Sequence, residues 1–313
     1  MKTRILVSLV LLPIFFAILF VFPPYVLTFV ISIICAIAAF ELLYATGCEK
    51  NKRILAYTMI AAALIPLAVY LSFLPVYSLD EAMSAQSADI VSDLDLYSRL
   101  VLISLLFTVV FIFMSMLLIE VILSYKTKKH IKFRLIPIAL AAGILIPYML
   151  SSLVSLKSMY YFTGVFLDIT PYGHLLVLLP IVSAFLTDSG AYFIGVAIGK
   201  RKAFPNISPN KTVEGCVGGI ISGTAGIMIY GMIIANTTNL TVIFPALVIY
   251  GIIGAVITEF GDLVFSFIKR KCGIKDYGKL IPGHGGMLDR FDSMIFTAPT
   301  MYLLVILLPA IIA

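Results

Sequence analysis

Long apolar runs make up most of the chain, and short clusters of charged, glycine and proline residues separate them. A helix needs roughly 20 mostly apolar residues to cross the hydrocarbon core of a bilayer. The fold class that this pattern predicts is an all-α polytopic membrane protein with nine membrane-spanning helices. The predicted spans are residues 5–22, 25–46, 54–77, 100–124, 135–151, 174–198, 215–235, 241–268 and 294–312.

The composition supports the same fold class. Of the 313 residues, 61% are hydrophobic and 12% are charged, whereas a soluble domain has about a quarter charged residues and about 45–50% apolar residues. No polar linker long enough to separate two domains interrupts the apolar runs. We therefore expect a single integral membrane domain over residues 1–313, with a motif-poor helical region at 1–172 and a catalytic region at 173–313.

Three smaller features complete this picture. The first run follows a basic start, as in a secretory signal, but no small-residue cleavage site comes after it, so we expect a retained first span. Residues 152–172 are only partly apolar, which leaves an interfacial or re-entrant segment open. The four cysteines show no CxxC pair and no regular spacing, which predicts thiols without disulfides.

Lysine and arginine residues gather in the loops on one predicted side of the membrane. With nine spans and the N-terminus inside, 20 of the 22 Lys and Arg residues are cytoplasmic, and Arg99 and Lys157 are the two exceptions. The acidic segment 78–98 falls outside. Because basic residues concentrate in cytoplasmic loops, this distribution predicts a cytoplasmic N-terminus. Glu41 and Glu120, near cytoplasmic helix ends, are expected to be solvated and not catalytic.

The densest polar segment covers residues 261–292 and begins on a helix. Four of its polar residues are spaced i, i+4, i+7 and i+8, which places them on one helix face, and Glu259 lies on the same side. A carboxylate followed by two cations suits a metal-bound polyphosphate, because the carboxylate can hold Mg²⁺ while the cations neutralise phosphate oxygens. The four residues are Asp262, Ser266, Lys269 and Arg270.

A glycine-rich turn follows at residues 282–286, with the sequence Pro-Gly-His-Gly-Gly. Its glycines permit positive φ and a close approach of the backbone, and successive N–H groups in such a turn can bind an anion. Asp289 and Asp292 come next at i and i+3, so both carboxylates could enter a metal site if a helix begins there. The turn and the two carboxylates together favour a phosphate and metal site over a plain structural turn.

Two more polar clusters lie in the same half of the chain. Asp188 lies well inside the predicted span 174–198, where an ionisable side chain indicates a functional role or a structural ion pair. Gly195 and Gly199 continue its helix face, which favours close helix packing. Residues 208–215 open the next span and carry Lys211, so they predict either a phosphate site at a helix N-terminus or a plain helix cap.

These motifs together resemble those of the phosphatidate cytidylyltransferases, the CDP-diacylglycerol synthases. The resemblance covers the chain from about residue 180 to its end, and the N-terminal half is similar only in being made of apolar spans. One departure is Phe265, which stands where the family usually has a glutamate; either that carboxylate is dispensable or Glu259 replaces it. The matching residues of the long signature are Ser266, Lys269, Arg270, Lys275, Asp276, Gly278, Pro282, His284, Gly285, Gly286, Asp289, Arg290 and Asp292.

The resemblance implies that CTP and phosphatidic acid react to give CDP-diacylglycerol and pyrophosphate in phospholipid biosynthesis. It implies Mg²⁺ as cofactor, with a second, monovalent cation left open, and metal ligands at Asp262 and Asp289. It also implies a homodimer in the cell membrane with its active site facing the cytoplasm, and no nucleic-acid partner. The residues expected in catalysis are Asp188, Lys211, Glu214, Ser266, Lys269, Arg270, Lys275, Asp276, His284, Arg290 and Asp292. Those expected to bind the nucleotide are Lys211, Lys269, Arg270, Gly283, Gly285, Gly286 and Arg290.

Two alternative functions stay open at this point. A CTP-dependent kinase acting on a polyprenol or phytol would share the apolar spans and the basic loops, but the signature at 266–292 argues against it. An ion-coupled transporter would explain Asp188, but transporters more often show inverted repeats, and none is evident here. The chain has no GxxxxGK[ST] motif, which excludes a P-loop kinase.

Overall fold

The computed structural model describes residues 13–48, 51–72, 88–126, 135–159, 173–278, 280 and 285–312, with the backbone alone at 88–102 and 125–126. Within this part of the chain, eight helices are long and apolar enough to cross a membrane, which confirms the all-α polytopic fold. They correspond to the last eight predicted spans, and most of the predicted span 5–22 lies outside the described residues. The eight are Pro24–Ala45, Lys52–Leu71, Ile103–Ser124, Leu135–Ser158, Gly173–Ile198, Val213–Thr237, Phe244–Lys271 and Leu288–Leu307.

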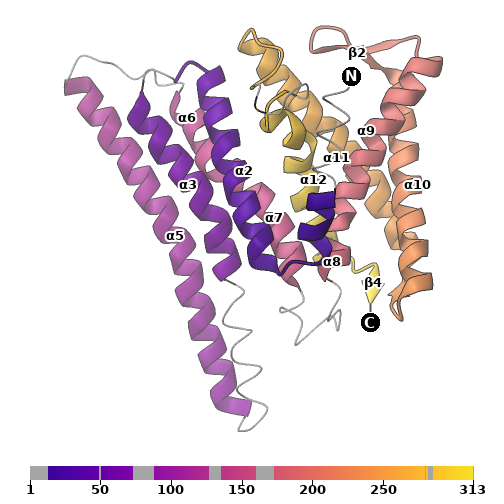
Figure 1. Cartoon of the computed structure of the whole chain (residues 1–313), viewed down its shortest axis with the longest axis horizontal. Helices are drawn as coiled ribbons and strands as arrows, with labels where there is room; N and C mark the ends of the chain where they lie inside the picture. Colours follow the sequence, from indigo (N-terminus) through magenta and orange to yellow (C-terminus); the bar gives the residue numbers. More distant parts are fainter. Residues whose placement is uncertain are drawn as a thin grey trace. The chain divides into compact units, whose positions relative to one another are not determined.

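The chain forms two compact units (Figure 1). The N-terminal unit comprises residues 1–162 and 277–288, and the C-terminal unit comprises residues 163–276 and 289–313. The predicted single membrane domain, with regions at 1–172 and 173–313, stays a prediction. The signature segment 261–292 contributes residues to both units.

The N-terminal unit is built from α2 (Pro24–Ala45), α3 (Lys52–Leu71), α5 (Ala88–Lys126) and α7 (Ile146–Ser158). Before α7 come α6 (Leu135–Leu140) and a π-helical turn, η1 (Ala141–Leu145). Helix α3 packs against α2, α5 and α7. Pro24 is pre-organised for the first turn of α2, and Gly47 ends that helix with a φ of 83°, a conformation that favours glycine.

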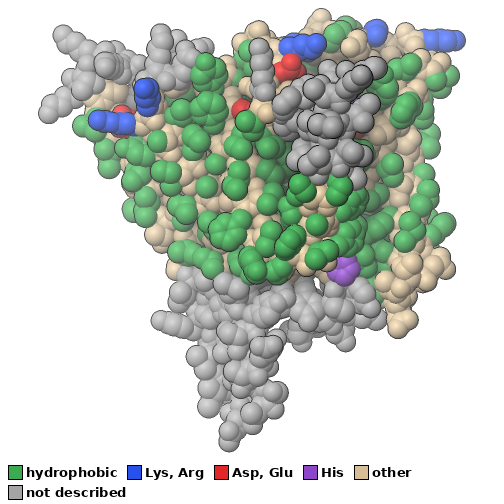
Figure 2. Space-filling model, in the orientation of Figure 1, with side chains coloured by type: hydrophobic (Ala, Val, Ile, Leu, Met, Phe, Trp, Pro, Cys, Tyr) green, Lys and Arg blue, Asp and Glu red, His purple; other side chains and the backbone are tan. Residues whose placement is uncertain are grey.

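Apolar side chains cover both the interior and much of the surface of this unit. Helix α2 buries Ile31, Cys35 and Leu42 along one face, whereas α5 leaves Phe107 and Phe111 largely exposed. Apolar side chains are spread widely over the described surface in Figure 2. In water, such surface would cause aggregation, and it is the expected surface of a helix that faces lipid. The protein is a multi-pass membrane protein.

Lys157 is one of the two basic residues that the predicted topology places on the outer side of the membrane. The structure places it in the last turn of α7, where it is buried. Its Nζ donates hydrogen bonds to the carbonyl oxygens of Ile18 (2.6 Å) and Phe22 (2.7 Å). Lys157 therefore binds carbonyl groups in the N-terminal unit, and this contact explains a cation outside the basic loops.

The C-terminal unit consists of long helices joined by short strands. Its helices are α8 (Gly173–Leu176), α9 (Leu178–Ile198), α10 (Val213–Thr237), α11 (Phe244–Lys271) and α12 (Leu288–Leu307), and its strands are β1 (Lys202–Phe204), β2 (Ser208–Thr212), β3 (Thr241–Val242) and β4 (Ile311–Ile312). Leu288, the first residue of α12, belongs to the N-terminal unit. Strands β1 and β2 form an antiparallel hairpin, and β3 pairs antiparallel with β4. Helix α10 packs against both α9 and α11.

Small residues allow α9 and α10 to approach closely. A Cβ on Gly195 would lie 3.1 Å from Thr212 Oγ1, and a Cβ on Gly215 would lie 2.8 Å from the carbonyl oxygen of Ala191. A Cβ on Gly199 would meet Thr212 at 2.5 Å. The predicted helix-packing role of Gly195 is confirmed, because helices with small residues at the contact bring their backbones together in a membrane. Gly199 lies one residue after α9 and contacts Thr212 of β2 instead.

Candidate active site

Helix α11 presents the predicted polar face. Ser266 Oγ donates a hydrogen bond to Asp262 Oδ1 at 3.4 Å, and Ser266 and Lys269 are both buried. Arg270 is exposed and turned elsewhere: its Nε donates to the carbonyl oxygen of Ile207 at 3.1 Å and its Nη1 donates to that of Ile274 at 3.3 Å. The helical spacing thus brings Asp262, Ser266 and Lys269 together, while Arg270 anchors the loop of the β1–β2 hairpin.

Strand β2 carries Lys211 to this face. Lys211 Nζ lies 2.8 Å from Asp262 Oδ2 and 3.9 Å from Glu259 Oε2, and the Glu259 residue is 7% exposed. Burial alone would lower the pKa of Lys211, but the attraction of Asp262 and Glu259 outweighs it and raises that pKa. The ammonium group is therefore charged at neutral pH.

The hairpin that positions Lys211 is fixed at both of its ends. Thr212 caps α10 by accepting a hydrogen bond from Gly215 N at 3.1 Å, so a helix cap is present one residue after Lys211. The Glu214 carboxylate accepts hydrogen bonds from the backbone N–H groups of Lys200 (3.0 Å) and Arg201 (3.2 Å). Glu214, expected to be catalytic, makes contacts here that hold the start of the hairpin.

The first turn of α12 supplies a second ion-paired group. Lys269 Nζ lies 3.0 Å from Asp289 Oδ1 and 3.8 Å from Asp292 Oδ2. The Asp292 Oδ1 atom accepts a hydrogen bond from Ser293 N at 2.9 Å. Gly261 allows this approach of α12, because a Cβ there would lie 3.1 Å from the carbonyl oxygen of Asp292.

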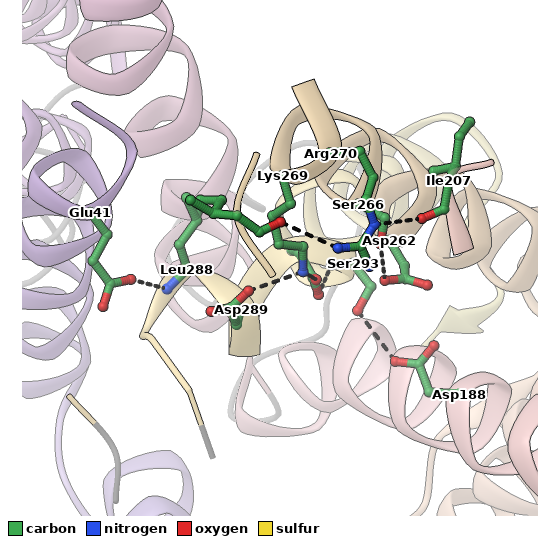
Figure 3. Close-up of polar contacts among 12 residues, drawn as sticks. Glu41, Asp188, Ile207, Asp262, Ser266, Lys269, Arg270, Leu288, Asp289 and Ser293 are labelled. Carbon is green, nitrogen blue, oxygen red and sulfur yellow. Dashed lines mark hydrogen bonds and ion pairs between the residues drawn. The ribbon is translucent and has the colours of Figure 1, made fainter. Parts of the chain in front are cut away.

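Asp188 joins this arrangement from α9. Ser293 Oγ donates a hydrogen bond to Asp188 Oδ2 at 3.4 Å (Figure 3). The carboxylates of Asp188 and Asp292 both interact electrostatically with Asp262. The three polar clusters that the sequence shows separately, on α9, on β2 and on α11 with α12, therefore meet in the C-terminal unit. We call this set the acid–lysine cluster: Asp188, Lys211, Glu259, Asp262, Lys269, Asp289 and Asp292.

The charge of the acid–lysine cluster favours a cation. It contains five carboxylates and two ammonium groups, so negative charge is in excess when all seven are ionised. Carboxylate oxygens are the donors that Mg²⁺ prefers, and Mg²⁺ commonly uses one or two protein carboxylates together with substrate phosphates and waters. Among the described residues, no three His, Cys, Asp or Glu side chains are grouped as a ready ion cage. The donor set fits Mg²⁺ held jointly by protein and substrate.

The remaining predicted site residues lie outside this cluster. Lys275, Asp276 and Arg290 are exposed, and none pairs with the cluster in the part of the chain that the structure describes. Gly283 and His284 lie outside the described residues. Their predicted roles stay predictions.

The glycine turn is visible at its second half. Gly285 has a φ of 88°, as expected for a glycine in a tight turn. A Cβ on Gly286 would lie 2.6 Å from both carboxylate oxygens of Glu41. The expected anion-binding role of Gly285 and Gly286 stays a prediction, and the contact shown for Gly286 is with an acidic side chain.

Glu41 corrects a prediction. It was expected to be solvated, but it is 4% exposed and its carboxylate accepts hydrogen bonds from Met287 N (3.0 Å) and Leu288 N (2.8 Å). Helix α2 approaches the turn here within the N-terminal unit, which removes the carboxylate from solvent. The signal that could have revealed it is an acidic residue surrounded by an apolar run. Glu120, by contrast, pairs with the largely exposed Arg53 at 3.8 Å.

Phe265 occupies the position where a glutamate was expected from the resemblance. It is buried and its ring lies 6.3 Å from that of Phe296 in an edge-to-face arrangement. This position is part of an apolar contact between α11 and α12. Glu259 supplies a carboxylate near Lys211 six residues earlier on α11. Replacement of the missing carboxylate by Glu259 stays a prediction.

The fold and the acid–lysine cluster define a multi-pass membrane protein with ion-paired lysines and several acidic groups in one unit. A family model described as the cytidylyltransferase family matches residues 2–308, and the chain belongs to this family. The resemblance inferred from the motifs is thereby confirmed.

Three relatives illustrate the similarity. A phosphatidate cytidylyltransferase of Bacillus subtilis is 41% identical over 140 residues, which is 45% of this chain and 51% of that protein. One of Thermotoga maritima is 34% identical over 161 residues, 51% of this chain and 60% of that protein. The uncharacterized protein YnbB of Escherichia coli is 44% identical over 130 residues, 42% of each chain. The aligned parts span about half the length of these relatives.

Proposed function

We propose that this protein is a phosphatidate cytidylyltransferase, which transfers the cytidylyl group of CTP to phosphatidic acid and releases pyrophosphate. The observation that carries this proposal is the acid–lysine cluster of a chain that belongs to the cytidylyltransferase family. Two named relatives are phosphatidate cytidylyltransferases, which points to this lipid substrate. A membrane-embedded fold suits an enzyme whose substrate is a lipid.

The reaction requires little acid or base chemistry. A phosphate monoester has its second pKa at about 6, so at neutral pH phosphatidate is largely dianionic and can attack the α-phosphorus of CTP directly. The main obstacle is repulsion between two anionic reactants. Charge neutralisation and in-line positioning are therefore what the protein has to supply.

The residues of the cluster match this task. Asp262 and Asp289 would hold Mg²⁺, which when bound neutralises phosphate charge and restricts phosphate oxygens to one geometry. Lys211 and Lys269, each already next to one of these carboxylates, would donate charge-assisted hydrogen bonds to phosphate oxygens. Asp188 would support the charge balance from α9.

Isotopic labelling tests the proposed reaction. The purified protein is incubated with phosphatidate, Mg²⁺ and CTP labelled at the α- or the γ-phosphorus. The expected result is lipid that carries the α label, with the β- and γ-phosphorus released together as pyrophosphate. Lipid with γ label and no α label would instead identify a CTP-dependent lipid kinase, and folded protein that labels no lipid would favour a transporter.

The proposal includes a homodimer and an active site on the cytoplasmic face, where CTP is available. Asn206 in the β1–β2 hairpin and Asn239 after α10 are both exposed and lie beyond opposite ends of that helix. Single cysteines at these positions, in a background without the four native cysteines, form a matched pair. Asn206→Cys should react with an impermeant thiol reagent only after permeabilisation, and Asn239→Cys should react in intact cells. The reverse pattern would contradict the proposed orientation.

A further inference from the structure

Glu41 makes a contact for which the proposed reaction has no role so far. Its two carboxylate oxygens accept separate hydrogen bonds, from Met287 N to Oε1 and from Leu288 N to Oε2 (Figure 3 shows the second). Both donors are backbone groups at the start of α12, where N–H groups lack an intrahelical acceptor. A carboxylate can accept both bonds at once, which an amide or hydroxyl side chain cannot do with the same geometry.

The surrounding glycines show that the turn is shaped around this carboxylate. A Cβ on Gly286 would lie 2.6 Å from both oxygens of Glu41 and 2.7 Å from Gly278 N. A Cβ on Gly278 would collide with Glu41 Oε1. Glycine at both positions thus permits a contact that any side chain would obstruct.

The location of Glu41 makes a passive role unfavourable. It lies in the last five residues of α2, where the partial negative charge of the helix C-terminus disfavours a carboxylate. It is also buried, and a buried charge destabilises a protein unless hydrogen bonds compensate it. The two N–H groups provide that compensation, so the carboxylate and the turn depend on each other.

The chain continues from the anchored Leu288 directly to Asp289 and Arg290. We propose that Glu41 is a positioning residue that fixes the backbone before Asp289, and so sets the direction in which this metal-binding carboxylate leaves the turn. The proposal rests on the proposed function for the role of Asp289. The anchoring contact itself joins the carboxylate of Glu41 to the backbone N–H groups of Met287 and Leu288.

The first test uses Glu41→Gln, which keeps the size of the side chain but offers one acceptor oxygen in place of two. Amide hydrogen exchange of a peptide covering residues 285–290 is measured on metal-free protein in detergent. Loss of a charge-assisted hydrogen bond should speed exchange at Met287 and Leu288 by about 10-fold or more. Turnover is then measured over a Mg²⁺ titration, in which the half-saturating Mg²⁺ concentration should rise about 10-fold, as when a residue that orients a metal ligand is changed.

Glu120→Gln is the matched control, because it removes another carboxylate of the N-terminal unit that pairs with Arg53. It should leave both readouts at their wild-type values. Unchanged exchange in Glu41→Gln would overturn the anchor, and faster exchange with an unchanged Mg²⁺ requirement would overturn the positioning role. If the wild-type protein makes no CDP-diacylglycerol, the proposed function fails, while the exchange measurement still tests the anchor.

A double-mutant comparison separates this contact from general loss of folding. Gly278→Ala in the wild-type background should lower turnover, because its Cβ would collide with the Glu41 carboxylate. The three atoms nearest to that Cβ all belong to the Glu41 side chain, so in a Glu41→Ala background it has space and Gly278→Ala should cause little further loss. Strictly additive effects of the two substitutions would contradict a shared contact.

Discussion

The two units bury polar side chains in different ways. In the N-terminal unit, the two charged side chains each bind backbone groups. Glu41 accepts hydrogen bonds from N–H groups, and Lys157 donates hydrogen bonds to carbonyl oxygens. In the C-terminal unit, buried charges bind one another across several elements, as Lys269 does with Asp289. A charge bonded to backbone stabilises a local structure, whereas charges paired with one another can exchange partners when an ionic substrate arrives.

Loss of a carboxylate from the cluster should have the largest effect. Asp262→Asn and Asp289→Asn each remove a ligand of the proposed Mg²⁺, which would neutralise the phosphates, so turnover should fall at least about 10³-fold. Both proteins should remain folded, because an amide of the same size keeps the packing. Turnover is measured across a Mg²⁺ titration, and Asp262→Asn that retains more than about a tenth of wild-type turnover would remove Asp262 from the metal site.

Loss of a lysine from the acid–lysine cluster should have the second-largest effect on turnover. Lys269→Met keeps most of the volume but removes the cation beside Asp289 and Asp292. A donor aimed at transition-state charge is typically worth about 10²–10³-fold in turnover. Turnover and KM for CTP are measured together with the apparent melting temperature. Wild-type turnover per folded molecule would show that Lys269 acts on structure alone.

The fold was readable from the sequence because lipid imposes a simple length rule. Eight described spans match predicted ones, including the start of α10 after Lys211. The polar face of α11 was also predictable, since helical periodicity fixes which residues share a side. These patterns did not show which side chains contact one another, and the tertiary structure was needed for that.

The missed features depend on contacts between segments distant in sequence. Glu41 and Leu288 are 247 residues apart, so no local pattern could pair them. The outward turn of Arg270 also follows from a distant contact, with Ile207 in the hairpin. The sequence identified the residue types of the site, and the packing of α9, β2, α11 and α12 decided which of them meet.

The lysine of the other unit should behave differently from Lys269. Lys157→Met removes the donor to the carbonyl oxygens of Ile18 and Phe22, and hydrogen bonds to a charged group are worth about 1.5–3 kcal/mol. The apparent melting temperature in detergent should therefore fall. Turnover per folded molecule should stay at the wild-type value. A loss of turnover as large as that of Lys269→Met would break the distinction between the two units.

The smallest effect concerns glycines at helix contacts. A Cβ on Gly219 would lie 2.7 Å from Glu259 Oε1 and 3.0 Å from the carbonyl oxygen of Thr187, which is backbone and cannot easily move. A Cβ on Gly143 in the N-terminal unit would instead lie 2.7 Å from the ring of Phe113, a side chain that can shift.

Gly219→Ala should therefore destabilise the protein by about 1–2 kcal/mol through overpacking. It should also lower turnover, because the added methyl group pushes on Glu259 in the acid–lysine cluster. Gly143→Ala should lower the melting temperature less and leave turnover unchanged. Both quantities are measured on the two variants in the same detergent. Equal losses of turnover would mean that helix packing limits activity in both units, since the charged cluster is contacted by only one of these glycines.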